Sequence, residues 1–363
     1  MFSLRLIALL VATGTVGNAM AETELPQARK VDGKYQNIHP IQTRSLAKVP
    51  VIAKEWVTAK HQLSEPKHGV IPIEKINADG LQHGDALSFY RLGHSTILLS
   101  LDQQWWLIDP VFSERASPVQ WAGPKRFHDA PIDIAVLPPI RGVIISHDHY
   151  DHLDKTAIKQ LKDKADNFIV PVGVDNLIKD WGVPTQKVHG LSWWQSIHIG
   201  SVQLTATPAQ HFSGRGITDG DETLWASWVI KGEKENTFYS GDGGYFDGFK
   251  LIGEQLGPFD VTFIETGAYN KTWANVHMMP EQSVQAHMDV QGKYMVPVHN
   301  STFDLSLHAW YEPLERVQAA ALANDVNLLT PKIGEKVELS QLQTGLWWKA
   351  LMPRGKLSAA VVE

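Results

Sequence analysis

The chain contains no cysteine among its 363 residues. Disulfide bonds, thiolate metal ligands and cysteine nucleophiles are therefore excluded, and any bound metal must be held by nitrogen and oxygen atoms. The sequence has no run of basic residues and a net charge of −6, so we expect no nucleic-acid partner. With 43% hydrophobic and 20% charged residues, the composition is typical of a globular protein that buries a large core.

Long apolar runs are also missing, with one short exception at the N-terminus. Arg5 precedes the apolar run Leu6–Ala12, and Ala19-Met20-Ala21 has the small-residue pattern of a signal-peptidase site. Because a transmembrane helix needs about 20 apolar residues, this run is too short to span a bilayer. We expect residues 1–21 to be a cleaved secretory signal and the protein to be exported, to the periplasm or to a membrane surface. An uncleaved N-terminal anchor is the alternative.

The pattern of the remaining residues predicts three regions. Residues 22–80 are polar and rich in proline, which indicates an extended arm with one short helix around Ala53–His61. Residues 81–345 form one α/β (α+β) domain, in which strands come first and strand–helix alternation follows. Residues 346–363 form a C-terminal tail. We expect the paired tryptophans to pack in the core rather than on a bilayer: Trp105-Trp106, Trp193-Trp194 and Trp347-Trp348.

The most informative stretch is Ser146–Asp154, which holds three imidazoles and three carboxylates within nine residues. It follows the apolar run Gly142–Ile145, which predicts a buried strand, and it precedes a predicted helix, Lys155–Leu161. The cluster is thus expected on a loop at the carboxyl end of a strand, where α/β proteins usually place their chemistry. Its H-x-H-x-D-H pattern consists of His147, His149, Asp151 and His152.

Later strand ends supply candidate partners for this motif, namely His211, Asp242, Thr266 and His299. One loop cannot direct four groups at a single ion, but it can serve two neighbouring ions. Each ion then needs one more imidazole, and a shared carboxylate can bridge them. His211, His299 and Asp242 meet these needs. Two metals roughly 3.5–4 Å apart can hold a bridging hydroxide and polarise a substrate oxygen. Mixed His/Asp ligation suits Zn²⁺, with Fe and Mn left open.

Other polar residues near the motif are expected to support it rather than to bind metal. Asp148 and Asp154 are predicted to be outer hydrogen-bond partners or helix caps. His94 is predicted to be an outer partner, and His287 to pack on its helix. Tyr150 and Tyr269 could orient a phosphate, although a structural role is expected for both.

H-x-H-x-D-H followed by distant His, Asp and His in this order resembles the metallo-β-lactamase superfamily. Between Gly93 and Pro313 the chain is also similar to N-acylphosphatidylethanolamine-hydrolysing phospholipase D. The matching segments include Gly93-His94-Ser95-Thr96, Asp109-Pro110-Val111-Phe112-Ser113, Gly123-Pro124-Lys125-Arg126-Phe127, Leu137-Pro138-Pro139-Ile140, Pro208-Ala209-Gln210-His211, Leu224-Trp225-Ala226-Ser227-Trp228, Gly267-Ala268-Tyr269 and Thr302-Phe303. The resemblance implies an αββα sandwich, with two mixed sheets flanked by helices and a dinuclear site at one edge.

The resemblance also implies a distribution of ligands. One zinc would take His147, His149 and His211, the other would take Asp151, His152 and His299, and Asp242 would bridge them. His277 matches a histidine beside the site that meets substrate or assists catalysis. Here Met278-Met279-Pro280 follows His277 in place of a carboxylate before the proline, so the hydrogen bonding of His277 is an open question.

The expected activity is that of a zinc-dependent phosphodiesterase of phospholipase D type. A metal-bridged hydroxide would attack the phosphorus of an N-acylphosphatidylethanolamine-like phospholipid, with transient contact to a membrane surface. The products would be phosphatidic acid and an N-acylethanolamine. Two alternatives stay open: a hydrolase of the same fold that opens a lactone or a β-lactam, and a non-enzymatic metal-binding protein of the cell envelope.

Overall fold

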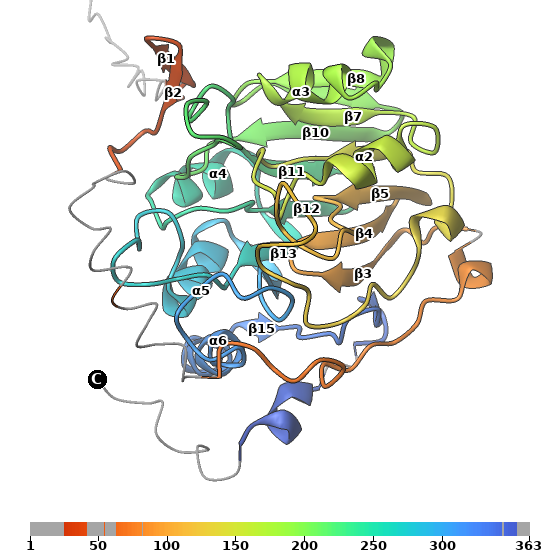
Figure 1. The fold of residues 1–363 in the computed structure, drawn as a ribbon, viewed down its shortest axis with the longest axis vertical. Coiled ribbons are helices and arrows are strands. Elements are labelled where there is room, and N and C mark those ends of the chain that lie inside the picture. The colour runs from red at the N-terminus through yellow and green to blue at the C-terminus, as the bar shows by residue number, and fades with distance from the viewer. Residues whose placement is uncertain (1–24, 42–53, 55–62, 82, 343–344, 354–363) are drawn as a thin grey trace, which may run out of the picture.

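Two seven-stranded β-sheets lie face to face, and α-helices cover their outer sides (Figure 1). The computed structural model describes residues 25–41, 54, 63–81, 83–342 and 345–353. The predicted signal at residues 1–21 lies outside these ranges, as does the predicted helix Ala53–His61 apart from Lys54. The expected α+β fold, an αββα sandwich, is confirmed. No helix within the described ranges is both long and apolar enough to cross a membrane.

The first sheet combines an antiparallel half with a parallel half. Its strands are β3 (Leu87–Gly93), β4 (Thr96–Leu101), β5 (Gln104–Ile108), β6 (Gly142–Ile144), β7 (Phe168–Pro171), β8 (Val188–Leu191) and β16 (Lys336–Glu338). They pair in the order β16-β3-β4-β5-β6-β7-β8. Pairing is antiparallel from β16 to β5 and parallel from β5 to β8. The parallel half brings the ends of β5 and β6 to the same edge.

The second sheet is also mixed. Its strands are β9 (Ser196–Ile199), β10 (Val202–Thr207), β11 (Ser227–Lys231), β12 (Asn236–Tyr239), β13 (Phe259–Glu265), β14 (Gly292–Val298) and β15 (Asn327–Leu328). They pair in the order β15-β14-β13-β12-β11-β10-β9. Pairing is parallel from β12 to β15, and β11 runs antiparallel to both β10 and β12. The carboxyl ends of β10, β12, β13 and β14 therefore lie at one edge of the sheet.

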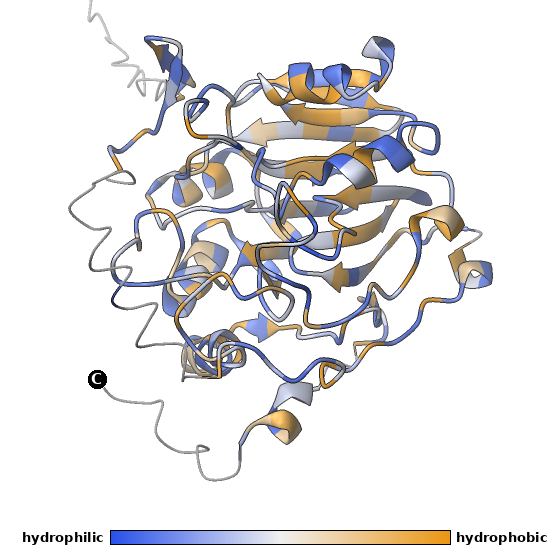
Figure 2. Ribbon diagram, viewed as in Figure 1, coloured by the Kyte–Doolittle hydropathy of each residue, from blue (hydrophilic) through white to orange (hydrophobic). Residues whose placement is uncertain are grey.

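Helices pack on each outer face because both sheets are apolar on both sides. The helices are α2 (Lys155–Leu161), α3 (Val174–Asp180), α4 (Gly248–Leu256), α5 (Pro280–Asp289) and α6 (Glu312–Ala323). α2 and α3 pack on the first sheet, and α4, α5 and α6 pack on the second. A third apolar cluster fills the space between the sheets. In Figure 2 the strands are mainly apolar and the connecting loops mainly hydrophilic.

Both ends of the described chain pack against the sandwich. Within the predicted extended arm, β1 (Arg29–Val31) and β2 (Lys34–Gln36) form a hairpin that the sequence analysis did not predict. Its turn residues Asp32 and Gly33 have φ of 50° and 79°, the left-handed backbone that tight two-residue hairpins require. Near the C-terminus, Trp348 is fully buried beside Ile71 and Leu314. Trp105, Trp106 and Trp193 are buried as well, as expected for core residues, whereas Trp194 and Trp347 are half-buried.

The carboxyl edge of the sandwich is stabilised by a tryptophan that joins the sheets. Trp228 on β11 is fully buried, and its Nε1 donates to the Ile145 carbonyl, 2.8 Å away, immediately before the His/Asp loop. We expect Trp228→Phe to lower the free energy of unfolding by roughly 2–4 kcal/mol, because it leaves a buried carbonyl unpaired and a cavity behind. Trp121→Phe is the control, because Trp121 is 82% exposed. Urea denaturation measures both, and equal effects would contradict the prediction.

Candidate metal centre

Loops at one edge of the sandwich bring the seven predicted ligands together. The loop after β6 carries the H-x-H-x-D-H residues, and β12 leads into Asp242. β10 leads through Pro208 to His211, and β14 leads directly into His299. Because these strand ends lie at the same edge of the two sheets, residues more than 150 positions apart in the chain become neighbours. The imidazole rings of His147, His152, His211 and His299 are buried.

Three imidazoles converge in a first group. His147 Nε2 lies 2.9 Å from His149 Nδ1, and His211 Nε2 lies 3.3 Å from the same nitrogen. Nitrogen ligands at about 2.05 Å around a tetrahedral zinc ion would be about 3.3 Å apart. The spacing of these atoms is therefore suitable for holding one ion between them.

A second group contains Asp151, His152 and His299. His299 Nε2 and His152 Nε2 lie 3.2 Å and 3.6 Å from Asp151 Oδ2. Asp242 Oδ2 lies 2.9 Å from His299 Nε2 and 3.0 Å from His152 Nε2. It also lies 3.9 Å from His147 Nε2 of the first group. Asp242 is thus the carboxylate that touches both groups, in the position expected for a bridging ligand.

A buried carboxylate at the end of β5 orients the second group from behind. The side chain of Asp109 is fully buried and accepts a hydrogen bond of 2.6 Å from His152 Nδ1. It also accepts from the backbone N–H and hydroxyl of Ser146 and from the Tyr239 hydroxyl. With Nδ1 donating to Asp109, the free His152 Nε2 faces the site. This carboxylate–histidine arrangement is the usual outer support of a metal-binding imidazole.

Other ligand rings are oriented in the same way. His211 Nδ1 donates to the Val276 carbonyl at 3.0 Å, which directs Nε2 toward His149. Ser146 Oγ lies 2.9 Å from His147 Nδ1. His94 Nε2 lies 3.0 Å from Asp151 Oδ2, and His94 also lies within the spacing of a common ion with Asp151, His152 and His299, so its role as an outer partner stays a prediction.

His277 lies beside the first group and is held by a glutamate. His277 Nδ1 donates to Glu265 Oε1 at 3.2 Å, and Met278 N donates to Glu265 Oε2 at 3.0 Å. Glu265 is the last residue of β13 and is fully buried, and this burial raises the pKa of its carboxyl. Glu265 therefore supplies the hydrogen-bond acceptor for His277 that Met278 and Met279 cannot provide. His277 can approach His211 and Asp242 within the spacing of a common ion.

The two groups differ in the pKa values of their imidazoles, which are lowered in the first group and raised for His152 and His299 in the second. Burial lowers the pKa of His147 and of His211 well below the usual value, which favours the neutral imidazole that binds metals. Burial opposes ionisation of Asp242, yet His152 and His299 hold its pKa well below the usual value. Burial likewise opposes a charge on His299, but Asp242 and Asp151 raise its pKa to about 10. The site therefore contains ionised carboxylates that a divalent cation would neutralise.

The other polar residues singled out in the sequence form hydrogen bonds within the protein. Asp148 accepts from Gly214 N and from the Thr223 hydroxyl, and it belongs to no ligand group within the described residues. Asp154 caps α2 by accepting from the amides of Thr156 and Ala157. The remaining three predicted supporting residues bond within the protein: His287 to Thr262, Tyr150 to the Arg215 carbonyl, and Tyr269 to Glu312.

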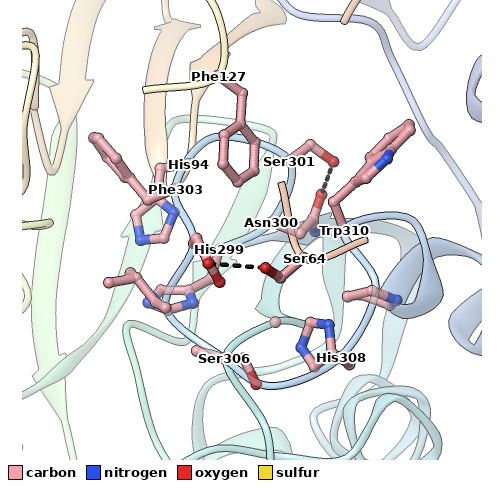
Figure 3. A pocket seen from close by; sticks show the side chains of 15 residues that line it. Ser64, His94, Phe127, His299, Asn300, Ser301, Phe303, Ser306, His308 and Trp310 are labelled. Carbon is pink, nitrogen blue, oxygen red and sulfur yellow. Dashed lines mark hydrogen bonds between the residues drawn. The ribbon is translucent and has the colours of Figure 1, made fainter. Parts of the chain in front are cut away.

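A small cavity of about 20 Å³ lies beside the second group (Figure 3). His94 and His299 line one side of it, and Ser64, Ser306 and His308 line another. Ser64 Oγ donates to Asp304 at 2.9 Å within this cavity. His308 stacks on Tyr269, with ring centroids 4.2 Å apart. The lining also includes Phe127, Phe303 and Trp310, so this recess next to the candidate ligands is partly polar and partly aromatic.

Sequence reasoning missed Asp109 and Glu265 as members of the site. In the sequence, Asp109 was identified only within a segment that matches the family, and Glu265 was not identified. Their position in the sequence could have identified them, since both carboxylates come at the carboxyl end of an apolar strand. His299, which was identified, also comes at the end of an apolar strand.

Comparisons with known proteins agree with this geometry. The pattern of the family described as "Beta-lactamase superfamily domain" matches residues 104–300. An uncharacterised protein of Mycobacterium tuberculosis is 39% identical over 326 residues, which cover 88% of this chain and 86% of that protein. N-acyl-phosphatidylethanolamine-hydrolyzing phospholipase D 1 of Caenorhabditis elegans is 32% identical over 287 residues, covering 74% of this chain and 81% of that protein.

A solved structure shows the same fold. A metallo hydrolase of the hyperthermophilic archaeon Ignicoccus hospitalis superposes with a TM-score of 0.54 at 21% identity, covering 69% of this chain and 97% of its own. The fold and the buried His/Asp groups together indicate divalent-metal binding. The chain therefore belongs to the beta-lactamase superfamily, as a metallo-β-lactamase-fold hydrolase that resembles N-acylphosphatidylethanolamine-hydrolysing phospholipase D.

Proposed function

We propose that the protein is a dinuclear zinc phosphodiesterase that cleaves N-acylphosphatidylethanolamine-like phospholipids as a phospholipase D. The observation that carries the proposal is the pair of ligand groups that share Asp242, because two adjacent metals are a common device for phosphodiester hydrolysis. The name of the nematode relative supports the substrate. A phospholipid substrate also implies transient contact with a membrane surface.

The residues present fit two zinc ions. His147, His149 and His211 would hold one, Asp151, His152 and His299 the other, and Asp242 would bridge. All donors are nitrogen or oxygen, as the absence of cysteine requires. Among the described residues, Asp242 Oδ1 is a buried atom without a hydrogen-bond partner. Buried polar atoms are rarely left so, and ligation would satisfy it.

Two bound zinc ions would supply an activated water and would polarise the phosphoryl oxygens. His277 is held through Nδ1 by Glu265, so its Nε2 is directed away from that carboxylate and is available to the substrate. The His277 side chain is 14% exposed, against 1% for His147, which makes it the more accessible of the two imidazoles. We assign His277 to contact with the phosphodiester or with the departing oxygen.

Lipid mass spectrometry tests the activity. Purified, zinc-loaded protein is incubated with N-acylphosphatidylethanolamine, with an unacylated phospholipid, and with lactone and β-lactam substrates. We expect phosphatidic acid and N-acylethanolamine from the first substrate. If only the lactone or the β-lactam is hydrolysed, the activity is hydrolysis of an acyl bond and not of a phosphodiester. Tight metal binding without any turnover would favour a non-enzymatic role.

Removal of a predicted ligand tests the metal site. We expect His147→Ala and Asp242→Ala to lower bound metal and to reduce kcat/KM by more than the roughly 100-fold that loss of an outer partner causes. His198→Ala, at an exposed position on β9, is the control. Metal content is measured by elemental analysis beside the rate. Full activity in a metal-free variant would refute the proposed mechanism.

Asp109→Asn tests the outer support of His152. The amide cannot accept from the His152, Ser146 and Tyr239 donors as the carboxylate does, so the imidazole loses its fixed orientation. We expect metal affinity to fall by roughly 10–100-fold, measured by competition with a chelator. Asp163→Asn, at an exposed position, should leave the affinity unchanged. Wild-type affinity in Asp109→Asn would show that this carboxylate is not needed.

A further inference from the structure

His211 lies outside the strands, yet both its backbone N–H and its carbonyl form hydrogen bonds with Asn37 of the N-terminal segment. We propose that Asn37 is a positioning residue, which holds the backbone of His211 so that its imidazole can complete the first metal group. The inference rests on the proposed metal site. It assigns a role to a segment that lies outside the family match at residues 104–300.

The contact is a two-sided pairing of a side-chain amide with a peptide. Asn37 Nδ2 donates to the His211 carbonyl at 2.7 Å, and the His211 N–H donates to Asn37 Oδ1 at 3.0 Å. In the middle of a sheet a neighbouring strand would make these two bonds. β10 ends at Thr207, so no strand is available, and the Asn37 amide takes that place.

Neighbouring contacts fix both partners of this pair. Trp225 Nε1 donates to Asn37 Oδ1 at 3.1 Å, which fixes the orientation of the amide. Gln210 Nε2 donates to the His39 carbonyl at 2.7 Å, which holds the residue before His211 to the same segment. The residues from Asn37 to His39 therefore hold the backbone of His211 and the side chain of Gln210.

The segment can do this because its hairpin is docked on the sandwich. Tyr35 N donates to the Asp221 carbonyl at 2.7 Å, and Lys34 Nζ donates to the Gly220 carbonyl at 2.9 Å. Trp194 Nε1 donates to the Pro26 carbonyl at 3.1 Å. Ile38 packs against the cluster between the sheets. Asn37 is thus anchored on both sides along the chain.

A separate contact orients the imidazole ring of His211. Nδ1 donates to the Val276 carbonyl, which sets the rotation of the ring, while Asn37 sets the position of the backbone that carries it. Loss of the Asn37 pairing would leave the ring attached to a loop, 208–226, that has no strand bonds at His211. The first metal group should then weaken, whereas the second group, which lacks His211, should not.

Cobalt titration of the full-length, metal-stripped protein tests this selectivity. The visible absorption of bound Co²⁺ reports the binding of the first and the second ion per protein, and chelator competition gives the two affinities. We expect Asn37→Leu to weaken one equivalent by roughly 10–100-fold, the range for outer partners of metal ligands, and to leave the other unchanged. The control is Lys34→Ala, which removes a docking bond of the same hairpin away from His211 and should affect neither equivalent.

A second variant keeps the test possible if the first one does not fold. If Asn37→Leu does not fold, Asn37→Asp replaces it, because its carboxylate would face the His211 carbonyl oxygen and repel it while keeping the size of the side chain. The inference would be overturned if the folded variant bound both Co²⁺ equivalents with wild-type affinity. Equal losses of affinity at both equivalents would overturn it as well. Failure of the wild-type protein to bind Co²⁺ would instead refute the proposed metal site.

Discussion

The buried carboxylate of Asp109 is the interaction on which the site depends, since it joins both sheets to the metal-binding loop. Asp109 follows β5 of the first sheet, Tyr239 ends β12 of the second, and Ser146 and His152 belong to the loop; all three of these partners donate to Asp109. A buried charge is costly unless hydrogen bonds satisfy it. Four donor groups do so here, and together they fix the sheet spacing and the orientation of a ligand ring.

The backbone is strained at the edge of the sandwich that carries the candidate metal site. The stability of the apolar core between the sheets offsets that strain. His94, Asp109 and His299 have φ of 48°, 39° and 64°. Each non-glycine residue in this left-handed region costs on the order of 1–3 kcal/mol. His299 N donates to the His94 carbonyl at 3.2 Å, so two of the strained residues hold each other across the sheets. A Cβ on Gly267 would lie 1.8 Å from the His299 carbonyl oxygen, which is why a glycine is needed there.

Local patterns predicted much of this structure, and long-range pairing accounts for the rest. β6 and α2 were predicted because an apolar run and a capping Asp154 identify them locally, and the candidate ligands were identified because their motif is contiguous or follows an apolar strand. α4, β8 and β9 were missed: β8 and β9 are short and polar for strands, and α4 begins with glycine. No local signal connects Asn37 with His211, which lies 174 positions away. Such contacts depend on how the finished sheets bring loops together.

The central claim is that two metal ions occupy the groups that share Asp242. Anomalous X-ray diffraction at the zinc edge, on crystals of zinc-loaded protein, tests it most directly. The account predicts two peaks roughly 3.5–4 Å apart. One should lie among His147, His149 and His211, and the other among Asp151, His152 and His299. A single peak, or peaks located away from Asp242, would contradict it.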